Sequence, residues 1–475
     1  MIGYLLGIIV LIEAALMVLP MGVALIYSES ALPFVITAAI MLILCLPFVI
    51  FKPKNTQIYA KEGFVTVAGG WILLSLFGTV PFVISGAIPN CVDAFFETVS
   101  GLTTTGATIL SEIESLPRGI LFWRSFTHWI GGMGVLVFML AILPSKGGQT
   151  MHLMRAEVPG PTKGKLVPKM RQTALILYGI YVALTLIETI ALLFCRMPLY
   201  DAVVTSVSTA GTGGFSVLNS SVAGYNNPAA EWVIAIFMFI FGVNFNIYFF
   251  IIIGKIKDAL KNEELKVYAI LTAASVAIIA INTASSFDRL GECIRASFFQ
   301  VTAIMSTTGF GTADFGLWPV LSKTILIWLM MSGACAGSTA GGLKLSRVMI
   351  LIKNVFREIK HMLRPKSVNV VRLDGEVVPD ETVRSATGYF ALYMTLIVTT
   401  ALVISIDGFS FEANFTAALS CINNIGPVLG EIGPTGNFSV FSTFSKIILS
   451  LCMLLGRLEI MPMVILFSPV TWKKR

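Results

Sequence analysis

Four short stretches rich in threonine, serine, asparagine and glycine recur along the chain, each between two long apolar runs. Each stretch ends in a glycine, and the four are Asp93 to Gly106, Tyr200 to Gly213, Ala296 to Gly309 and Ala413 to Gly426. A ring of backbone carbonyls can replace the hydration shell of a monovalent cation. Glycine suits such a ring because it lacks Cβ and adopts backbone angles that other residues avoid. The stretches therefore predict a cation pathway.

The alternative for any one stretch is a helix packing contact, since small and hydroxyl residues are common where membrane helices meet. Four stretches at the same place in four units of span, short helix, loop and span are harder to explain in that way. Irregular backbone at membrane depth is tolerated only where protein or a water-filled cavity surrounds it. The short helix before each loop would point its partly negative C-terminal end at that cavity, which favours a cation.

Other chemistries lack the residues that they need. The three histidines, His128, His152 and His361, do not have metal-ligand spacing, and the seven cysteines form no C-x-x-C pair. A membrane enzyme would require His, Asp or Cys clustered at one depth, and we find no such cluster and no nucleotide-binding loop. The net charge of +7 does not indicate a nucleic-acid partner, because the basic residues lie in short loops between apolar runs.

The elements that must position these stretches are membrane helices. The 475-residue chain is 56% hydrophobic and only 12% charged, whereas soluble domains carry about 25% charged residues. A helix crosses the bilayer core with about 20 apolar residues. The predicted fold is all-α integral membrane with about ten transmembrane helices, at residues 3–27, 32–51, 64–85, 120–143, 172–195, 230–254, 267–283, 322–352, 385–406 and 442–468.

Lysine and arginine predict the orientation, because cytoplasmic loops carry the excess of positive charge. Most of the 33 basic residues lie in alternate loops, at 52–63, 144–171, 255–266, 344–384 and 473–475. The other loops carry several acidic residues. We therefore expect both termini in the cytoplasm. The repeated unit divides the chain into an extra N-terminal helix pair, 1–55, and four pore repeats, 56–150, 151–262, 263–375 and 376–475.

The motifs resemble those of the Trk/Ktr/HKT superfamily of potassium transporters and channels, and most closely its TrkH branch, the membrane subunits of bacterial Trk uptake systems. The resemblance covers nearly the whole chain. It rests on T-T-T-G-A-T (103–108), G-T-G-G-F-S (211–216), S-T-T-G-F-G-T (306–312), I-N-N-I-G-P (422–427), G-A-C-A-G-S-T-A-G-G-L-K (333–344) and L-G-R-L-E-I (455–460). It implies four pseudosymmetric repeats of span, pore helix and span around one central pore, and potassium uptake across a bacterial inner membrane.

The resemblance also implies which residues form a potassium filter. The filter glycines would be Gly106, Gly213, Gly309 and Gly426, preceded by Thr104, Thr105, Gly211, Thr212, Thr307, Thr308, Asn424 and Ile425, whose carbonyls face the ion. Relatives that favour sodium carry serine at the first glycine position, so Gly106 favours potassium. The fourth stretch lacks the hydroxyl-rich triplet, so we expect a ring without strict four-fold symmetry.

A gate is expected in the eighth apolar run, which is interrupted by Gly333, Gly337, Gly341 and Gly342, with Ser338 and Thr339 between them and Lys344 after them. Each glycine in a helix interior costs about 1 kcal/mol relative to alanine, so this segment should unwind. A close helix crossing is the alternative. The resemblance implies a loop that occludes the pore below the filter.

Arg457, Arg124 and His128 lie within the predicted spans and need an explanation. Arg457 lies in the last run, where a charge is expensive. It either pairs with a carboxylate such as Glu459 or, as the resemblance implies, forms a barrier that faces the pore. We interpret Arg124 and His128, one helical turn apart, as residues at the membrane interface.

The resemblance implies the partners as well: a homodimer, membrane lipid, and a cytosolic TrkA-type nucleotide-binding subunit that docks on the polar segment 353–384. Potassium would be the transported ion, and this chain shows no nucleotide site of its own. The competing function is a secondary transporter that couples potassium to protons or sodium, which would use buried carboxylates near the midplane. Glu13 and Glu188 are the candidates, and neither has an evident partner, which favours passive conduction.

Overall fold

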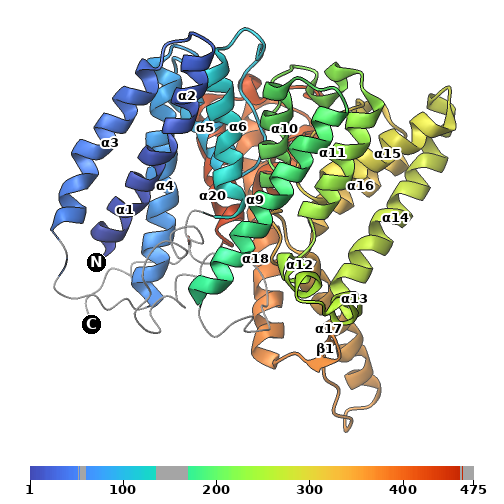
Figure 1. The fold of residues 1–475 in the computed structure, drawn as a ribbon. Coiled ribbons are helices and arrows are strands. Elements are labelled where there is room, and N and C mark those ends of the chain that lie inside the picture. The colour runs from blue at the N-terminus through green and yellow to red at the C-terminus, as the bar shows by residue number, and fades with distance from the viewer. Residues whose placement is uncertain (52, 54–59, 135–169, 461–462, 464–475) are drawn as a thin grey trace.

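The structure is a computed structural model that describes residues 1–475 except 52, 54–59, 135–169, 461–462 and 464–475. Nearly all of the regular secondary structure in the described chain is helical (Figure 1). Its helices are α1 (Ile2–Leu16), α2 (Val18–Ile26), α3 (Leu32–Ile50), α4 (Ala60–Ile84), α5 (Cys91–Leu102), α6 (Arg118–Gly132), α9 (Met170–Phe194), α10 (Leu199–Gly211), α11 (Pro228–Phe241), α12 (Phe245–Ile252), α13 (Ile256–Lys261), α14 (Glu263–Thr283), α15 (Leu290–Met305), α16 (Val320–Ser332), α17 (Leu345–Leu363), α18 (Asp380–Ile404), α19 (Phe411–Asn423) and α20 (Thr443–Arg457). Strands β1 (Arg372–Leu373) and β2 (Glu376–Val377) form an antiparallel hairpin. Short 3-10 turns lie at Ser221–Tyr225, Ala284–Ser286, Phe315–Leu317, Ser405–Asp407 and Phe438–Val440.

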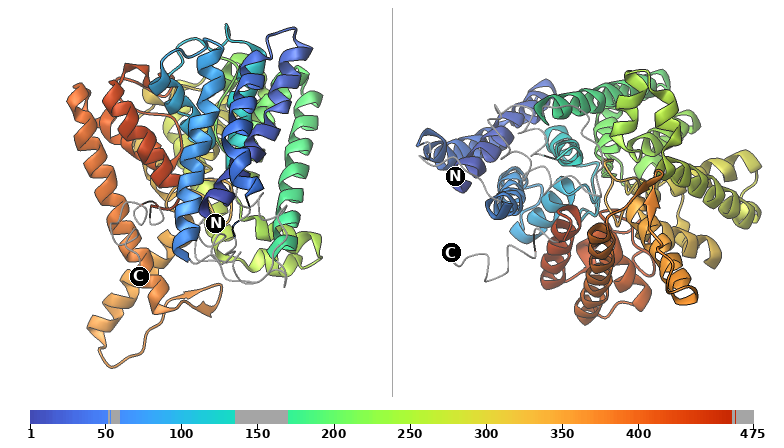
Figure 2. Two further views of the ribbon diagram at one scale, coloured as in Figure 1. Left: turned by 90° about the vertical axis from the view of Figure 1, so that its left-hand side faces the viewer. Right: turned by 90° about the horizontal axis from the view of Figure 1, so that it is seen from below.

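The helices follow one another around a centre in the order of the chain. Seen from below, the blue N-terminal helices are followed around the molecule by green, yellow, orange and red ones (Figure 2). The last helix returns to the first part of the chain, where Lys446 Nζ of α20 lies 2.7 Å from Asp93 Oδ1 of α5. Helix α17 and the β1–β2 hairpin extend from one end of the molecule (Figure 1).

Membrane-spanning helices account for much of the described chain, as the composition predicts. Six helical segments are long and apolar enough to cross a bilayer, or up to seven if the bent pair α11–α12 is one span. The six are Ile2–Ile26, Leu32–Ile50, Glu62–Ile84, Gln172–Phe194, Glu263–Ser286 and Asp380–Asp407. The molecule is thus an all-α integral membrane protein, and the total of ten spans stays a prediction.

Two of the predicted spans are not continuous helices. Run 230–254 is bent by 92° between α11 and α12. The bend arises because the Phe245 amide donates to the carbonyl of Gly337, at 3.0 Å, instead of continuing the helical ladder. Run 322–352 breaks between α16 and α17, as its glycines predict. The last parts of runs 120–143 and 442–468 lie outside the described residues, which place the ends of α6 and α20 at Gly132 and Arg457.

Four helices, α5, α10, α15 and α19, are too short to cross the membrane. They have 12, 13, 16 and 13 residues, whereas a span needs about 20. Each forms the first part of one of the four glycine-ending stretches and leads directly into its loop. Their C-terminal halves are almost wholly buried, so the loops that follow begin inside the protein.

Glycines let the neighbouring helices approach these loops. A Cβ atom on Gly131 of α6 would lie 1.8 Å from the carbonyl oxygen of Leu102, at the end of α5. A Cβ atom on Gly456 of α20 would lie 1.9 Å from the carbonyl oxygen of Ile422, at the end of α19. Backbone atoms cannot move aside as a flexible side chain can. The long helices therefore touch the short ones directly, and they fix where each loop starts.

We expect Gly131→Ala to destabilise the protein by about 1–3 kcal/mol, the usual cost of overpacking, because α6 must move away from Leu102. Thermal unfolding of the purified protein in detergent measures this. The matched control is Gly179→Ala in α9, where an added Cβ meets nothing within 4 Å and alanine should be neutral or slightly stabilising. Equal melting temperatures for the two variants would contradict the close helix contact.

Candidate cation pathway

The same unusual backbone recurs at the end of each short helix. A residue with positive φ appears at Thr104 (58°), Thr212 (57°), Thr307 (59°) and Asn424 (55°). A glycine with positive φ follows two residues later, at Gly106 (79°), Gly214 (79°), Gly309 (78°) and Gly426 (100°). Positive φ is a strained conformation for a β-branched residue such as threonine. Strain of this kind persists only where the surroundings impose it, and it gathers at functional sites.

The four loops touch one another in a closed ring. A Cβ atom on Gly106 would lie 2.0 Å from the carbonyl oxygen of Gly213. The same holds for Gly214 against Thr308 and for Gly309 against Ile425, both at 2.0 Å. Gly426 closes the ring, since its Cβ would lie 2.8 Å from the carbonyl oxygen of Thr105. Each glycine therefore allows a carbonyl of the next loop to approach closely, and the fourth glycine does so for the first loop. The result is one ring of backbone oxygens where the C-termini of the four short helices meet. Such a ring can bind a dehydrated cation.

The second loop enters this ring one residue later than the sequence analysis predicted. The ring positions are Thr212, Gly213 and Gly214, whereas the family resemblance implied Gly211, Thr212 and Gly213. The physical reason is that the first two glycines of G-T-G-G make room for helix α6. A Cβ atom on Gly211 would lie 2.3 Å from the carbonyl oxygen of His128, and one on Gly213 would lie 2.2 Å from the His128 ring. Alignment on the last glycine of the motif would have given the observed register.

The fourth loop replaces hydroxyl contacts with amide contacts. In the first and third loops, pairs of hydroxyls lie close together, Thr103 with Thr105 at 2.8 Å and Ser306 with Thr308 at 2.7 Å. Asn424 Nδ2 instead donates to Thr105 Oγ1 at 2.9 Å and to the Met453 carbonyl at 3.0 Å. The fourth loop is therefore hydrogen-bonded to the first loop, and the ring departs from strict symmetry as the sequence predicts.

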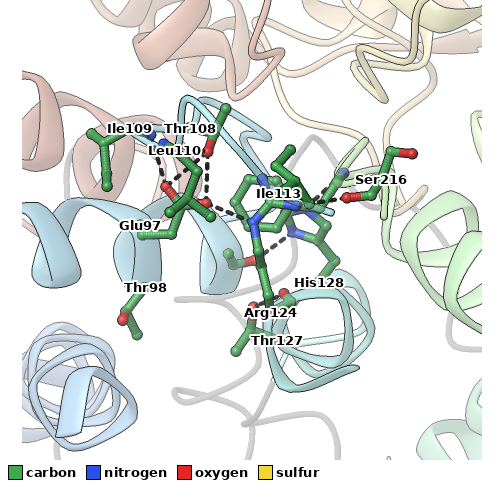
Figure 3. Close-up of polar contacts among 12 residues, drawn as sticks. Glu97, Thr98, Thr108, Ile109, Leu110, Ile113, Arg124, Thr127, His128 and Ser216 are labelled. Carbon is green, nitrogen blue, oxygen red and sulfur yellow. Dashed lines mark hydrogen bonds and ion pairs between the residues drawn. The ribbon is translucent and has the colours of Figure 1, made fainter. Parts of the chain in front are cut away.

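A charged network lies behind the first and second loops (Figure 3). Arg124 Nε of α6 lies 2.6 Å from Glu97 Oε1 of α5, and both side chains are almost fully buried, at 2% and 0% exposed. His128 Nδ1 donates to the Gly101 carbonyl at 2.7 Å, and its Nε2 accepts from the Phe215 amide at 3.3 Å. The interpretation of Arg124 and His128 as interfacial residues is therefore wrong. Helical spacing alone did not reveal that this face of α6 packs against protein.

The glycine-rich segment 333–344 is unwound and contacts the third loop and the C-terminal end of α19. Gly333, Gly337, Gly342 and Lys344 all have positive φ. The Gly341 amide donates to Thr307 Oγ1 at 2.7 Å, and a Cβ there would lie 2.3 Å from the Asn423 carbonyl oxygen. Ser338 Oγ and Lys344 Nζ donate to carbonyls within the segment. The segment thus touches the third loop and the end of the fourth short helix.

Arg457 is the last residue of α20, and its guanidinium reaches three backbone carbonyls. It donates to Thr339 at 2.9 Å, to Gly131 at 2.5 Å and to Gly132 at 2.9 Å. Glu459, the expected alternative partner, has its Oε2 2.7 Å from Arg347 Nη2. Arg457 therefore links the glycine-rich segment to the end of α6.

Comparison with known proteins places this architecture. Residues 33–474 match the model of the TrkH family of cation transport proteins. The chain is 36% identical to the Trk system potassium uptake protein TrkH of Salmonella typhimurium and 34% identical to that of Escherichia coli K12, in both cases over 98% of each chain. Its fold matches the crystal structure of the potassium transporter TrkH from Vibrio parahaemolyticus with a TM-score of 0.89, at 30% identity over 99% of both chains.

These features define a membrane transport protein built from α-helices. The protein belongs to the TrkH family of cation transport proteins, which confirms the resemblance seen in its motifs.

We expect potassium to raise the melting temperature of the purified protein, because a ligand that binds only the folded state stabilises it. Gly309→Ala should abolish that rise, since its Cβ would strain a φ of 78° and lie 2.0 Å from the Ile425 carbonyl oxygen. Gly311→Ala is the control two residues away, where an added Cβ meets nothing within 4 Å. The comparison is made at equal ionic strength with a large organic cation. If both variants keep the potassium effect, the ring is not the ion site.

Proposed function

We propose that this protein forms a gated, potassium-selective pore that takes up potassium across a bacterial inner membrane. The observation that carries the proposal is the closed ring of four glycine–carbonyl contacts at the C-terminal ends of four short helices. Backbone oxygens in such a ring replace the hydration shell of the ion. Relatives at 34–36% identity are potassium uptake proteins by name, which supports potassium as the ion.

The filter consists of Thr104, Thr105 and Gly106 and their counterparts in the other three loops. We retain the division into an N-terminal pair and four pore repeats, because the same backbone pattern recurs four times. Glycine at position 106 favours potassium over sodium, since a side chain there would meet the carbonyl oxygen of the second loop.

Segment 333–344 acts as the gate, and Arg457 holds it in place. The segment contacts the third loop and the C-terminal end of α19, and these contacts support a role in closing the ion path. Arg457 holds it through the Thr339 carbonyl and adds a positive charge that repels cations.

A coupled transporter is the second candidate, and the side chain of Glu13 is the observation in its favour. Glu13 is buried, and its carboxyl oxygens have no hydrogen-bond partner among the described residues. It lies against Gly78 of α4, however, and not on the ring. Recording from reconstituted protein separates the two candidates, because only a channel gives resolvable unitary currents.

The protein works as a homodimer with a cytosolic nucleotide-binding subunit of the TrkA type. Relatives named as parts of a Trk system support a multi-component assembly. Helix α17 supports a protein contact at the end where it extends, because it exposes Val355, Phe356 and Ile359 at helical spacing. We assign helix α17 and both termini to the cytoplasmic side, because the alternate loops of the sequence that include 344–384 carry most of the basic residues.

Gly106→Ser is the test of the filter. The added side chain would displace the Gly213 carbonyl, 2.0 Å from its Cβ, and widen the ring, so sodium should permeate more readily. The measurement is the reversal potential of liposome-reconstituted protein in mixed potassium and sodium. Reversal potentials that coincide for the variant and the wild type would refute the filter assignment.

Arg457→Ala tests whether Arg457 holds segment 333–344 in place. Removing the guanidinium releases the Thr339 carbonyl and lowers the barrier to cations, so potassium flux into liposomes should rise while selectivity changes little. Arg457→Lys is the matched control, because it keeps the charge but lacks the fork that reaches several carbonyls. A well-folded Arg457→Ala protein with wild-type or slower potassium flux would show that Arg457 does not limit conduction.

A further inference from the structure

The buried pair Glu97–Arg124 contacts two different loops of the ring. Glu97 holds the exit of the first loop, where it accepts from Thr108 Oγ1 at 2.8 Å and from the Ile109 amide at 2.9 Å. Arg124 holds the exit of the second loop, where its Nη1 donates to the Ser216 carbonyl at 3.0 Å. The pair therefore forms a continuous bridge from one loop to the next (Figure 3).

Aromatic contacts reinforce the same bridge. The guanidinium carbon of Arg124 lies 3.5 Å from the centroid of the Phe215 ring, one residue after the ring glycine Gly214. The His128 ring contacts Phe215 from α6, with 4.2 Å between ring centroids. Arg124 thus contacts both the backbone of the second loop and the Phe215 side chain of that loop, while Glu97 accepts hydrogen bonds from the first loop.

The other loops are held by neutral groups. On the third short helix, Gln300 Nε2 donates to the Ala313 carbonyl at 3.2 Å. On the fourth, Thr416 Oγ1 accepts from the Leu429 amide at 3.0 Å. Each of these bonds holds only the loop that follows its own helix. Among the described residues, Glu97–Arg124 is the only salt bridge with both side chains less than 5% exposed.

Burying a charge pair is not in itself a route to stability, because desolvation offsets the attraction between the charges. A pair that spans two elements can instead fix their relative position. Here the elements are the two loops that supply the Thr105 and Gly213 carbonyls of the ring. Their separation sets the size of the cage that an ion enters.

We infer that Arg124 is a positioning residue for ion selectivity, which holds the first and second loops at the separation that suits potassium. The inference rests on the proposed function, since it assumes that the ring is the filter. Arg124 acts through the loops and does not touch the ion path. Selectivity is then controlled unevenly around the ring, and most strongly from the side of α6.

Arg124→Lys is the primary test. The lysine ammonium retains the charge opposite Glu97, but it is a point donor without the planar fork that also reaches Ser216 and covers Phe215. We expect the variant to fold and conduct, with a potassium-to-sodium permeability ratio lower by about threefold to tenfold. A change of this size corresponds to the partial loss of one hydrogen bond to a charged group. The readout is the reversal potential of the full chain in liposomes, together with its melting temperature.

Arg295→Lys is the matched control. Arg295 of α15 also bonds a glutamate through Nε, with Glu231 of α11 at 2.7 Å, and its permeability ratio should stay at the wild-type value. Glu97→Gln/Arg124→Gln covers the possibility that the lysine variant does not fold. It leaves no orphan charge behind, and it should lower the ratio in the same way.

The outcomes separate this inference from the proposed function. If Gly106→Ser lowers the permeability ratio but neither Arg124 variant does, the filter stands and the inference about Arg124 is overturned. An equal decrease in Arg295→Lys would overturn it as well, because any change of an arginine that pairs with a glutamate would then have the same effect. If Gly106→Ser also leaves the ratio unchanged, the proposed filter itself fails.

Discussion

Four stretches of non-helical backbone lie inside this membrane protein, and their carbonyls constrain everything around them. In a bilayer, an unsatisfied carbonyl costs several kcal/mol, and irregular backbone survives only when protein or a hydrated cavity encloses it. The loops meet this constraint by enclosing one another. Each ring glycine admits a neighbouring loop's carbonyl at a distance that any side chain would prevent. The ring is therefore a property of four loops together, and none of them is stable in this form alone.

The helices around the ring fix the positions of loops that have no regular secondary structure of their own. Gly131 and Gly456 bring α6 and α20 into direct contact with the ends of α5 and α19. Charges then join parts of the chain far apart in sequence, Arg124 to Glu97 behind the first two loops and Lys446 to Asp93 between the last helix and the first short one. Threonines in strained, positive-φ conformations remain possible because this surrounding shell leaves them no alternative.

The sequence predicted the parts of this architecture that repeat. The short helices, the glycine loops and the break at 333–344 all follow from composition and from glycine placement. The register of the second loop was missed because two consecutive glycines, Gly213 and Gly214, fit the glycine position, and the sequence does not show the close approach of His128 to Gly213. The burial of Arg124 and His128 was also missed. The hydropathy pattern indicates that a charged residue must avoid lipid, but it does not indicate which part of the protein that residue will pack against.

The sharp bend between α11 and α12 was equally invisible, and its cause shows how the unwound parts depend on one another. The Phe245 amide, at the bend, donates to the Gly337 carbonyl, and the Cys335 amide donates to the Gly242 carbonyl. Two broken helices thus satisfy each other's open backbone groups. Glu264 of α14 accepts from the amide of Ala336 in the same segment and from that of Ser346, at the start of α17. If the segment moves as the proposed gate, its displacement would expose these groups and require new partners, which water can provide.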